Sequence, residues 1–566
     1  MLSTQRIAHL GEALFDATHA YPTQTAFIEA NRDRVNGVWT HAEVRREADR
    51  VGGLLQSAGV ESGERVAILM GNQARWPISA MAVFRAGAVA IPLDYKLTAG
   101  EQLALLRHGP PKVLVTERFL WKRLLEEDPA LASTLVAILP EVPEDADLQG
   151  AIRWESESDS VVPVPRERDD LACSVYSSGT GGTPKGCMLT HANYLAQAEV
   201  LGTLFPLIES DRYFSILPTN HAIDFMCGFI LPMLFGATVV HQRTLRPQFI
   251  ASTMKRHRIT HMAVVPLLLK ALGDRIREQL DALPTWQRQI ADGLISVNDT
   301  LTAKRPVHAV SSRLLKPIHD AFGGHLKQLF CGGAFVDPDL ARFFYRLGLP
   351  VAIGYGLTEA GTVVTVNDLK PFRPDTVGVP VPGTSVEVRD VDANGVGEVW
   401  IQGPTVMQGY LDAPDLTAET IVDGWLRTGD LGHFDASGHL KLMGRRSNMI
   451  VTEGGKNIYP EDIEAAFEDL SECEESCVFA TDFIWPRGSM IDETLVLVVR
   501  PEDALTETAR THVSERNRTL ADFKRVRHVL VWNDPFPRTA SMKVKRSELA
   551  RQIAEQCSPD ALEEAA

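Results

Sequence analysis

One segment, Tyr176–Gly186 (YSSGTGGTPKG), gathers residue types that bind phosphate. Its glycines allow backbone N–H groups to approach an anion closely, its hydroxyls add hydrogen-bond donors, and Lys185 adds a positive charge. A Ser/Gly-rich surface turn is the plain alternative, but such a turn does not need so many small residues before a lysine. The P-loop of nucleotidases requires glycine directly before the lysine and Ser or Thr after it. Here Pro184 precedes Lys185 and Gly186 follows it, so that class of site is excluded.

The overall composition limits what surrounds this segment. The chain has 566 residues and a formal net charge of −16, with 45% hydrophobic and 23% charged residues. That length predicts more than one domain, and the balance is typical of a globular protein. An acidic chain lacks the broad basic face that nucleic acid requires, which argues against nucleic-acid binding. Seven cysteines without a Cys-x-x-Cys pair indicate reduced thiols in a cytoplasmic protein rather than disulfides or a zinc site.

Short strand-like runs alternate with helical patterns through most of the chain. Arg65–Met70 and Met262–Pro266 are examples of the runs, and Trp76–Arg85 is an example of the helical pattern. Alternation of this kind predicts parallel sheets covered by helices. Residues 281–313 have weak periodicity and are interpreted as a connecting insertion. The longest uncharged apolar stretch, Phe225–Val240, is too short to span a bilayer and is interpreted as buried core that can line an apolar cavity.

The pattern changes after about residue 374. Alternating strands separated by glycine-rich turns predict a small antiparallel barrel or sheet there. These strands are Ser385–Arg389, Glu398–Gln402 and His439–Met443. The predicted fold class is therefore α/β, with parallel-rich sheets covered by helices and a small, mobile α+β domain at the C-terminus. The predicted parts are an N-terminal adenylation domain over 1–443 that contains the β-barrel subdomain at about 374–443, a hinge at 444–447, and a C-terminal lid domain at 448–566.

The phosphate-binding segment resembles that of the acyl-adenylate-forming superfamily of AMP-binding enzymes, which includes acyl-CoA synthetases, luciferases and adenylation domains. Further segments similar to that family's follow in the family's order. They are Gly332-Gly333-Ala334, Gly354–Glu359, Gly397–Trp400, Gly424–Asp430, Gly444-Arg445, Gly454–Lys456 and Pro537–Lys543. Together these segments extend over about residues 173–545, and chance agreement on that scale is negligible. The chain is identified as a member of this superfamily, most similar to long-chain fatty acyl-CoA synthetases.

The resemblance implies an ATP site with defined roles. The residues expected to bind the nucleotide are Ser177, Ser178, Gly179, Thr180, Gly181, Gly182, Thr183, Lys185, Gly332, Gly333, Ala334, Gly354, Tyr355, Gly356, Thr358, Asp430, Arg445 and Lys543. Catalysis is assigned to Lys543, Thr358, Glu359 and Lys185, and Mg²⁺ binding to Thr180 and Glu359. Mg²⁺ suits a site with few protein ligands, because it keeps waters and substrate phosphates in its coordination shell. Adenine is expected to lie between the small residues at Gly332–Ala334 and the ring of Tyr355.

The implied chemistry is activation of a carboxylic acid with ATP, Mg²⁺ and coenzyme A. The carboxylate attacks the α-phosphorus, pyrophosphate leaves, and coenzyme A then takes the acyl group from the adenylate. Gly454, Gly455 and Lys456 are assigned to coenzyme A, although a structural turn is equally compatible with the two glycines. The two steps imply rotation of the C-terminal domain about the hinge. Ser447 stands where the family usually has Asp or Lys, and Met542 stands where a glycine usually precedes the lysine.

The acid is expected to contact His221, Phe225, Gly333 and Gly356. Without the resemblance, His221 is better explained as a hydrogen-bonded core histidine, and the run that begins at Phe225 can be a core helix as well as a wall of the acid site. No polar residue for an amino acid's ammonium group is apparent. The insertion between Arg275 and Phe330, with the sequence Ser311–Leu315, and the segment Val451–Asn457 resemble long-chain acyl-CoA synthetases.

The predicted function is that of a medium- or long-chain fatty acid–CoA ligase that releases AMP and pyrophosphate. Two alternatives stay open. One is a fatty acyl-AMP ligase that loads an acyl carrier protein, and the other is a catalytically silent nucleotide- or lipid-binding homologue. The expected partners are the small-molecule substrates, with no nucleic acid, and peripheral membrane contact and a carrier protein are left open.

Overall fold

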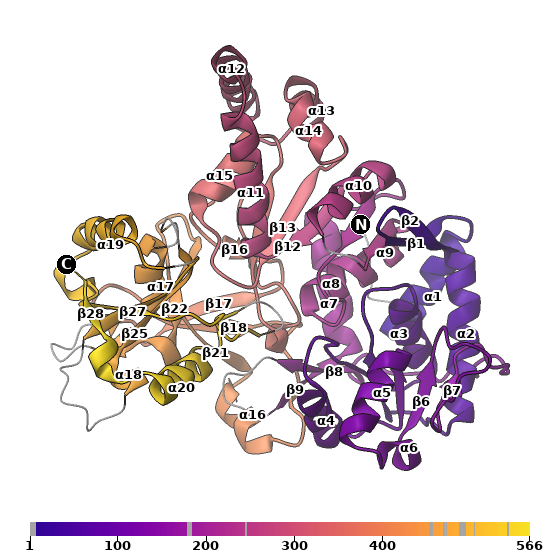
Figure 1. The fold of residues 1–566 in the computed structure, drawn as a ribbon. Coiled ribbons are helices and arrows are strands. Elements are labelled where there is room, and N and C mark those ends of the chain that lie inside the picture. Colours follow the sequence, from indigo (N-terminus) through magenta and orange to yellow (C-terminus); the bar gives the residue numbers. More distant parts are fainter. Residues whose placement is uncertain are drawn as a thin grey trace. The chain divides into compact units, whose positions relative to one another are not determined.

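The computed structural model describes residues 7–177, 184–243, 246–451, 457–467, 470, 473–485, 494–502, 504–539 and 543–565. The chain forms two compact units. Figure 1 shows the helices and strands, coloured in the order of the sequence. Unit 1 comprises Met1–Gly179, Thr183–Val386 and Ile401–Leu426. Unit 2 comprises Thr180–Gly182, Glu387–Trp400 and Arg427–Ala566. Unit 2 therefore also includes part of the predicted β-rich subdomain, and the proposed hinge at 444–447 stays a prediction.

A nine-stranded sheet in unit 1 carries the strands that end at the candidate site. Its strands, in spatial order, are β16 (Val379–Pro380), β15 (Thr365–Val366), β14 (Val351–Tyr355), β13 (Gln328–Gly332), β12 (His261–Val264), β10 (Arg212–Ser215), β11 (Thr238–Gln242), β1 (Thr25–Asn31) and β2 (Arg34–Thr40). The strands from β14 to β1 pair in parallel, and the outer pairs are antiparallel. The parallel arrangement predicted from the alternating pattern is thus confirmed.

A second, eight-stranded sheet belongs to the same unit. In spatial order it contains β19 (Gly409–Tyr410), β9 (Lys185–Thr190), β8 (Leu171–Ser177), β4 (Val89–Pro92), β3 (Arg65–Leu69), β5 (Val113–Thr116), β6 (Val136–Leu139) and β7 (Ile152–Arg153). The pairs from β8 to β7 are parallel, whereas β8–β9 and β9–β19 are antiparallel. In this sheet, β9, which follows the predicted phosphate loop, pairs with β19, a strand that lies far along the chain.

Helices cover these sheets. The helices of unit 1 are α1 (Leu10–Ala20), α2 (His41–Ser57), α3 (Arg75–Arg85), α4 (Ala99–His108), α5 (Arg118–Glu127), α6 (Leu131–Thr134), α7 (His191–Leu204), α8 (Ala222–Phe225), the π-helical turn η1 (Met226–Ile230), α9 (Leu231–Phe235), α10 (Pro247–His257), α11 (Pro266–Asp281), α12 (Thr285–Thr302), α13 (His308–Leu314), α14 (Lys316–Ala321), α15 (Pro338–Arg346) and α16 (Pro414–Thr420). Thr190 begins α7 with a capping box, because its hydroxyl accepts from the N–H of Asn193 while the Asn193 side chain accepts from the N–H of Thr190.

The β-rich region predicted from about residue 374 forms a five-stranded sheet. Its order is β17 (Ser385–Arg389), β18 (Gly397–Gln402), β21 (Trp425–Phe434) and β20 (Ile421–Val422), with β22 (Leu440–Arg445) paired to β21. The described pairings leave β17 and β20 at the edges, so the region forms a sheet, one of the two forms, barrel or sheet, that were predicted. The pairs β20–β21 and β21–β22 are antiparallel, as expected.

The rest of unit 2 is a small α+β fold. It contains β23 (Ile450–Val451), β24 (Asn457–Ile458), α17 (Pro460–Glu464), β25 (Cys473–Ala480), α18 (Thr481–Ile484), β26 (Leu495–Pro501), α19 (Glu507–Thr519), β27 (His528–Val531), α20 (Arg546–Gln556) and β28 (Glu563–Glu564). A four-stranded sheet in the order β25-β26-β27-β28 forms its centre. The predicted combination of helices and strands in this part of the chain is confirmed.

The segment that was interpreted as a connecting insertion is largely helical. Residues 281–313, whose periodicity is weak, contain α12 and most of α13. The periodicity is weak because α12 has apolar residues in two directions. Ile295 lies in the buried face, whereas Ile290 and Leu301 are exposed. No helix among the described residues combines the length and the apolarity needed to cross a bilayer.

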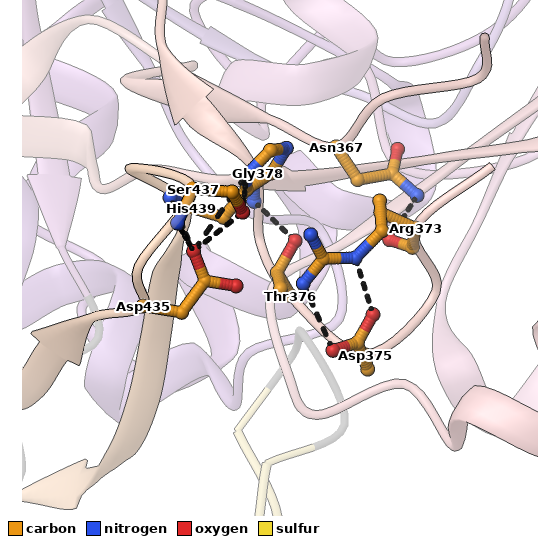
Figure 2. A network of polar contacts seen from close by, with 8 residues as sticks. All are labelled: Asn367, Arg373, Asp375, Thr376, Gly378, Asp435, Ser437 and His439. Carbon is orange, nitrogen blue, oxygen red and sulfur yellow. Dashed lines mark hydrogen bonds and ion pairs between the residues drawn. The ribbon is translucent and has the colours of Figure 1, made fainter. Parts of the chain in front are cut away.

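Polar contacts close two loops, one in each unit (Figure 2). In unit 1, between β15 and β16, the Arg373 guanidinium Nε donates to Asp375 Oδ1 at 2.9 Å. In unit 2, the β21–β22 turn is closed because Asp435 Oδ1 accepts from the backbone N–H groups of Ser437 and His439 at 2.9 and 3.1 Å. Each loop is thus held by its own short-range carboxylate contacts.

Because of three buried histidines in unit 1, we expect the folded protein to lose stability in acid. His41, His191 and His241 are almost fully enclosed. Burial lowers the pKa of His41 to about 4, and the pKa values of His191 and His241 to about 3. The same side chains titrate near 6.5 in the unfolded chain. Below that pH the unfolded chain takes up protons that the fold does not, so stability falls as the pH drops from about 6.5 toward 4.

Asp224 acts in the opposite direction, since burial raises its pKa to about 7 and stability falls as the pH rises from about 4 to that value. Burial also raises the pKa of Asp49, but the histidines of unit 1 with a lowered pKa outnumber these two carboxyls, so we expect the first thermal unfolding temperature to decrease as the pH is lowered from about 6.5 to about 4.5. In the His241→Leu variant, the unfolding free energy should depend less on pH by about 1.4 kcal/mol per pH unit. Unfolding curves at several pH values measure this, and equal pH slopes for variant and wild type would contradict the assignment.

Candidate functional site

An apolar pocket opens at the carboxyl ends of β13 and β14 in unit 1. Its walls include Phe205, Tyr213, Leu231 and Phe330. Its empty volume is about 730 Å³, counting the open mouth. None of the described residues that line it carries a charge. A concave apolar site at the ends of parallel strands is where α/β proteins commonly bind small ligands.

Glycines form one side of the pocket, and at two of them, Gly332 and Gly356, a side chain does not fit. Gly332 and Gly354 lie opposite each other in the β13–β14 register, and a Cβ on Gly332 would lie 2.7 Å from the Gly354 carbonyl oxygen. A Cβ on Gly356 would lie 1.7 Å from the carbonyl oxygen of Thr362. Gly333 has a φ of +85°, which glycine adopts readily. The structure thus brings four of the predicted site residues to one pocket, and their roles toward nucleotide and acid stay predictions.

Glu359 lies in the turn Thr358–Ala360 that follows β14, close to Lys185 and Tyr410. Its Oε1 accepts a hydrogen bond from the Tyr410 hydroxyl at 3.1 Å. The Lys185 Nζ lies 5.8 Å from the centre of the Tyr410 ring, since β19 pairs with β9, which begins at Lys185. Burial and the charge of Glu359 raise the pKa of Tyr410, so its hydroxyl stays a donor. Two predicted residues, Lys185 and Glu359, therefore meet around a tyrosine.

His221 is held by a carboxylate. It is the N-terminal cap of α8, and its Nε2 lies 3.2 Å from Asp94 Oδ2. Burial raises the pKa of Asp94, but the contact with His221 and the backbone N–H of Lys96 lower it below the usual value overall. A charged carboxylate beside one ring nitrogen fixes the orientation of an imidazole. His221 is two residues from Ile223, which lines the pocket.

Asp224 is fully buried next to the pocket wall. Its carboxyl group accepts hydrogen bonds from Tyr213 at 3.2 Å, Ser215 at 2.7 Å and Thr219 at 3.1 Å. Burial raises the pKa of Asp224 to about 7 in spite of these donors. A Cβ on Gly228 would lie 2.6 Å from Asp224 Oδ1, so the helix after it needs a glycine there. This cluster ties the end of β10 to α8 and fixes Tyr213 in the wall.

Phe225 does not line this pocket, and its predicted contact with the acid stays a prediction. It is 2% exposed, and its ring lies 5.1 to 5.7 Å from those of Trp76, Tyr194 and Phe229. The residues of this stretch that do line the pocket are Ile223, Cys227 and Leu231. They are four residues apart and share one helix face, whereas Phe225 points away from that face.

The neighbouring residues Ala334 and Tyr355 were predicted to hold adenine. Ala334 is exposed directly after β13, and Tyr355, the last residue of β14, is only 7% exposed. Neither is among the residues that line the pocket. Their contact with a nucleotide stays a prediction.

Asp430 and Arg445 lie opposite each other in unit 2. They are partners in the β21–β22 register, and Arg445 Nε lies 2.8 Å from Asp430 Oδ1. The Asp430 side chain is mostly buried, while that of Arg445 is half exposed. The two residues that were predicted separately to bind the nucleotide therefore form one ion pair.

The proposed hinge residue Ser447 is the middle residue of a tight turn, Arg446–Asn448, in unit 2. Both ends of that turn are anchored within the unit. Arg446 Nη1 lies 2.9 Å from Glu398 Oε2, and the Asn448 amide donates to Glu461 Oε1 at 2.6 Å. Ser447 itself contributes a contact of 3.4 Å to Asn448 and no charge.

Lys543 is exposed and lies in a hairpin of unit 2. Its backbone N–H donates to the Thr539 hydroxyl at 3.1 Å, and its carbonyl accepts from the Thr539 N–H at 2.8 Å. Arg538 and Val544 pair across the same hairpin. The backbone around the lysine is thus supported at both ends of the segment 540–542, which lies outside the described residues.

Several predicted residues lie outside the described part of the chain. They are Ser178, Gly179, Thr180, Gly181, Gly182, Thr183, Gly454, Gly455 and Lys456. Ser177 is the last residue of β8 and pairs in register with Lys185 of β9. The predicted phosphate loop therefore connects two paired strand ends.

The predictions from sequence missed three residues of this region, Asp94, Tyr410 and Asp224. Each makes its contact with a residue far away or on another element, and none belongs to a recognisable motif. Asp224 carried one usable signal, since it is an acidic residue directly before the apolar run that begins at Phe225. An acidic residue at such a position is seldom buried without a specific partner.

The residues around Glu359 fit a magnesium ion that arrives with phosphates. Among the described residues, no group of three or more His, Cys, Asp or Glu side chains is arranged to hold a metal. A lone carboxylate such as Glu359 is sufficient for Mg²⁺ when substrate phosphates and waters supply the remaining oxygens. The hydroxyl of Tyr410 holds one carboxylate oxygen and leaves the other for a cation.

The fold and the pocket define a two-unit α/β protein with a ligand site at the ends of parallel strands. The crystal structure of the anthranilate CoA ligase AuaEII in complex with anthranoyl-AMP shares this fold, with a TM-score of 0.77 at 22% identity over 96% of this chain and 97% of that one. The chain belongs to the family of AMP-binding enzymes, whose family model matches residues 14–411. The superfamily predicted from the sequence is thereby confirmed.

Curated relatives act on different acids. A feruloyl-CoA synthase of Amycolatopsis sp is 28% identical over 91% of this chain and 94% of its own length. The long-chain-fatty-acid–CoA ligase FadD15 of Mycobacterium bovis is 28% identical over 76% of this chain and 74% of its own length. Both names describe ligation of an acid to coenzyme A, and the acids differ.

Proposed function

We propose that this protein activates a medium- or long-chain fatty acid with ATP and Mg²⁺ and transfers the acyl group to coenzyme A. The observation that carries the proposal is the uncharged pocket of unit 1, which has glycines on one side and apolar walls elsewhere. Such a pocket favours a hydrocarbon tail, because each buried methylene contributes about 0.8 kcal/mol. An amino acid or a dicarboxylic acid would leave a charge there without a partner.

In the first step, the carboxylate oxygen attacks the α-phosphorus of ATP, and the bond to pyrophosphate breaks. Lys185 supplies positive charge to the phosphates, and Glu359 would hold Mg²⁺, which would supply further positive charge there. In this proposal His221, whose ring lies beside Asp94, contacts the acid's carboxylate. Lys543 supplies a further cation to the oxygens on which charge develops.

In the second step, the coenzyme A thiolate attacks the acyl carbon and AMP leaves. Asp430 accepts hydrogen bonds from the ribose hydroxyls in this proposal, and Arg445 contacts ribose or phosphate. Gly454, Gly455 and Lys456 bind the pantetheine arm. Ser447 acts as the hinge, and because its side chain is neutral, it lacks the charged contact that Asp or Lys could form there.

A pyrophosphate-release screen tests the function directly. Saturated fatty acids of graded length, ferulate, 2-succinylbenzoate and oxalate are each incubated with ATP and Mg²⁺, with and without coenzyme A. We expect turnover to rise with chain length and acyl-CoA to accumulate. Adenylate formation without acyl-CoA would favour transfer to a carrier protein. No pyrophosphate release with any acid would overturn the activity, and turnover only with ferulate would overturn the fatty acid assignment.

Narrowing the pocket should change acid selectivity. Ile223 lines the pocket and is only partly buried, so Ile223→Trp adds volume inside it without displacing a core residue. We expect kcat/KM to fall about tenfold or more for long acids and much less for short ones, because two or more methylenes lose their place. Ile223→Val is the matched control and should leave the preference unchanged. An equal loss for all chain lengths would contradict a tail-binding pocket.

A further inference from the structure

Helix α12 carries an apolar stripe that nothing in the described structure covers. Trp286, Ile290, Leu294, Val297 and Leu301 are 62%, 55%, 36%, 48% and 62% exposed. They recur every three or four residues, so they lie within one sector of roughly 80° on the helix. Isolated exposed apolar residues are ordinary, whereas an aligned set on one helix marks an interaction surface.

The stripe is distinct from the face that anchors the helix. The buried residues of α12 are Ile295, Asn298 and Thr302. The Asn298 amide donates to the Arg346 carbonyl at 2.9 Å, and the Tyr345 hydroxyl donates to the Thr302 carbonyl at 3.0 Å. These contacts fix α12 against α15. In Figure 1, α12 stands at the outer edge of the group of helices from α11 to α15.

The stripe is too small for a stable contact between two protein chains. A standard interface uses about 20–30 residues on each side. Five side chains along a helix of about 27 Å supply a fraction of that. A lipid surface needs much less, because the apolar side of one amphipathic helix, once immersed among acyl chains, provides the binding energy.

The local charge also suits a lipid surface. Residues 266–315 contain seven Lys and Arg against five Asp and Glu, an excess of two positive charges in a chain of net charge −16. Lys304 and Arg305 are exposed and follow directly after the last turn of α12. Trp286 is at the opposite end of the stripe, and a tryptophan is favoured at the boundary between headgroups and acyl chains. Of the negative charges on the helix, Asp299 is paired with Arg346.

We propose that α12 docks this protein on an anionic phospholipid bilayer, with the stripe from Trp286 to Leu301 immersed at the interface and Lys304 and Arg305 near the headgroups. The helix lies on the membrane and does not cross it. The docking does not depend on the acid that the pocket takes, so it can be tested without turnover.

Flotation of the whole 566-residue chain with vesicles tests the proposal. We expect binding to vesicles of phosphatidylcholine and phosphatidylglycerol, weaker binding to phosphatidylcholine alone, and loss at high salt of the part that depends on phosphatidylglycerol. The Ile290→Gln/Leu301→Gln double variant should reduce the partition coefficient by about tenfold or more. The reason is that it removes two aliphatic side chains that are immersed in the bilayer when the protein is bound. Ile208→Gln is the matched control, since Ile208 is 57% exposed outside the stripe, and it should bind like wild type.

Tryptophan fluorescence gives a second readout. Trp286 is the one largely exposed tryptophan of the nine, all of which lie in the described residues. Vesicles should shift its emission to the blue in the wild type and not in Trp286→Phe. Circular dichroism checks the folding of each variant. The proposal is overturned if wild type does not bind vesicles or if the double variant binds equally well. Sedimentation that shows a dimer abolished by the double variant would assign the stripe to a second copy of the chain instead.

Discussion

Replacing Lys543 with alanine is expected to slow adenylate formation by about a hundred- to a thousandfold, the usual cost of removing one group that stabilises developing negative charge. The loss should appear in kcat for pyrophosphate release with a fatty acid and ATP. The fold should be unaffected, because Lys543 is exposed and its backbone contacts with Thr539 do not involve the side chain.

Two controls separate this role from a general effect of charge. Lys545→Ala removes a lysine two residues away, whose Nζ lies 3.5 Å from Glu548 Oε2, and should cost little. Supplying the acyl-adenylate ready-made, with coenzyme A, bypasses the first step, and Lys543→Ala should then form acyl-CoA at close to the wild-type rate. Unchanged pyrophosphate release in Lys543→Ala would remove the residue from the mechanism.

Glu359→Gln is expected to lower kcat for adenylate formation by about a hundredfold or more, because the carboxylate charge that holds Mg²⁺ is lost while the shape is kept. The amide oxygen of the substituted side chain can still accept the hydrogen bond from Tyr410, so the local structure should persist. The remaining activity should need a higher magnesium concentration. A magnesium titration of pyrophosphate release measures both effects.

Two further variants, Tyr410→Phe and Glu419→Gln, test whether the effect of Glu359→Gln is specific to the carboxylate of Glu359. Tyr410→Phe removes one hydroxyl that orients Glu359 and should cost about fivefold, in line with the net value of a single hydrogen bond. Glu419 is an exposed glutamate on α16, and its change to glutamine should have no effect. If Glu359→Gln shows the magnesium dependence of wild type, Glu359 is not the metal ligand.

Regular elements with a clear local pattern were predictable from the sequence. The buried runs at β3 and β12 and the helix α3 were predicted within about two residues of their observed ends, because apolar composition and periodicity act over a few neighbours. The insertion that contains α12 was not predicted as a helix, since its two apolar faces blur the period on which such a prediction depends.

Contacts between distant residues decided the rest of the site. Asp94 and His221 are far apart in sequence, as are Tyr410 and Glu359, and neither pair has a local signature. The apolar run after His221 was predicted to wall the acid site, and which of its residues face the pocket of unit 1 depends on the helix face that packs on Trp76.

The amino-acid sequence by itself determined the family, the α/β class and the glycines of the pocket, because order of motifs, composition and the need for a missing side chain are local properties. Only the tertiary structure decided which apolar residues face the pocket, which carboxylate orients His221, which tyrosine holds Glu359, and which face of α12 stays uncovered. Those features arise from long-range packing, where each side chain's environment is supplied by segments that the local sequence does not specify.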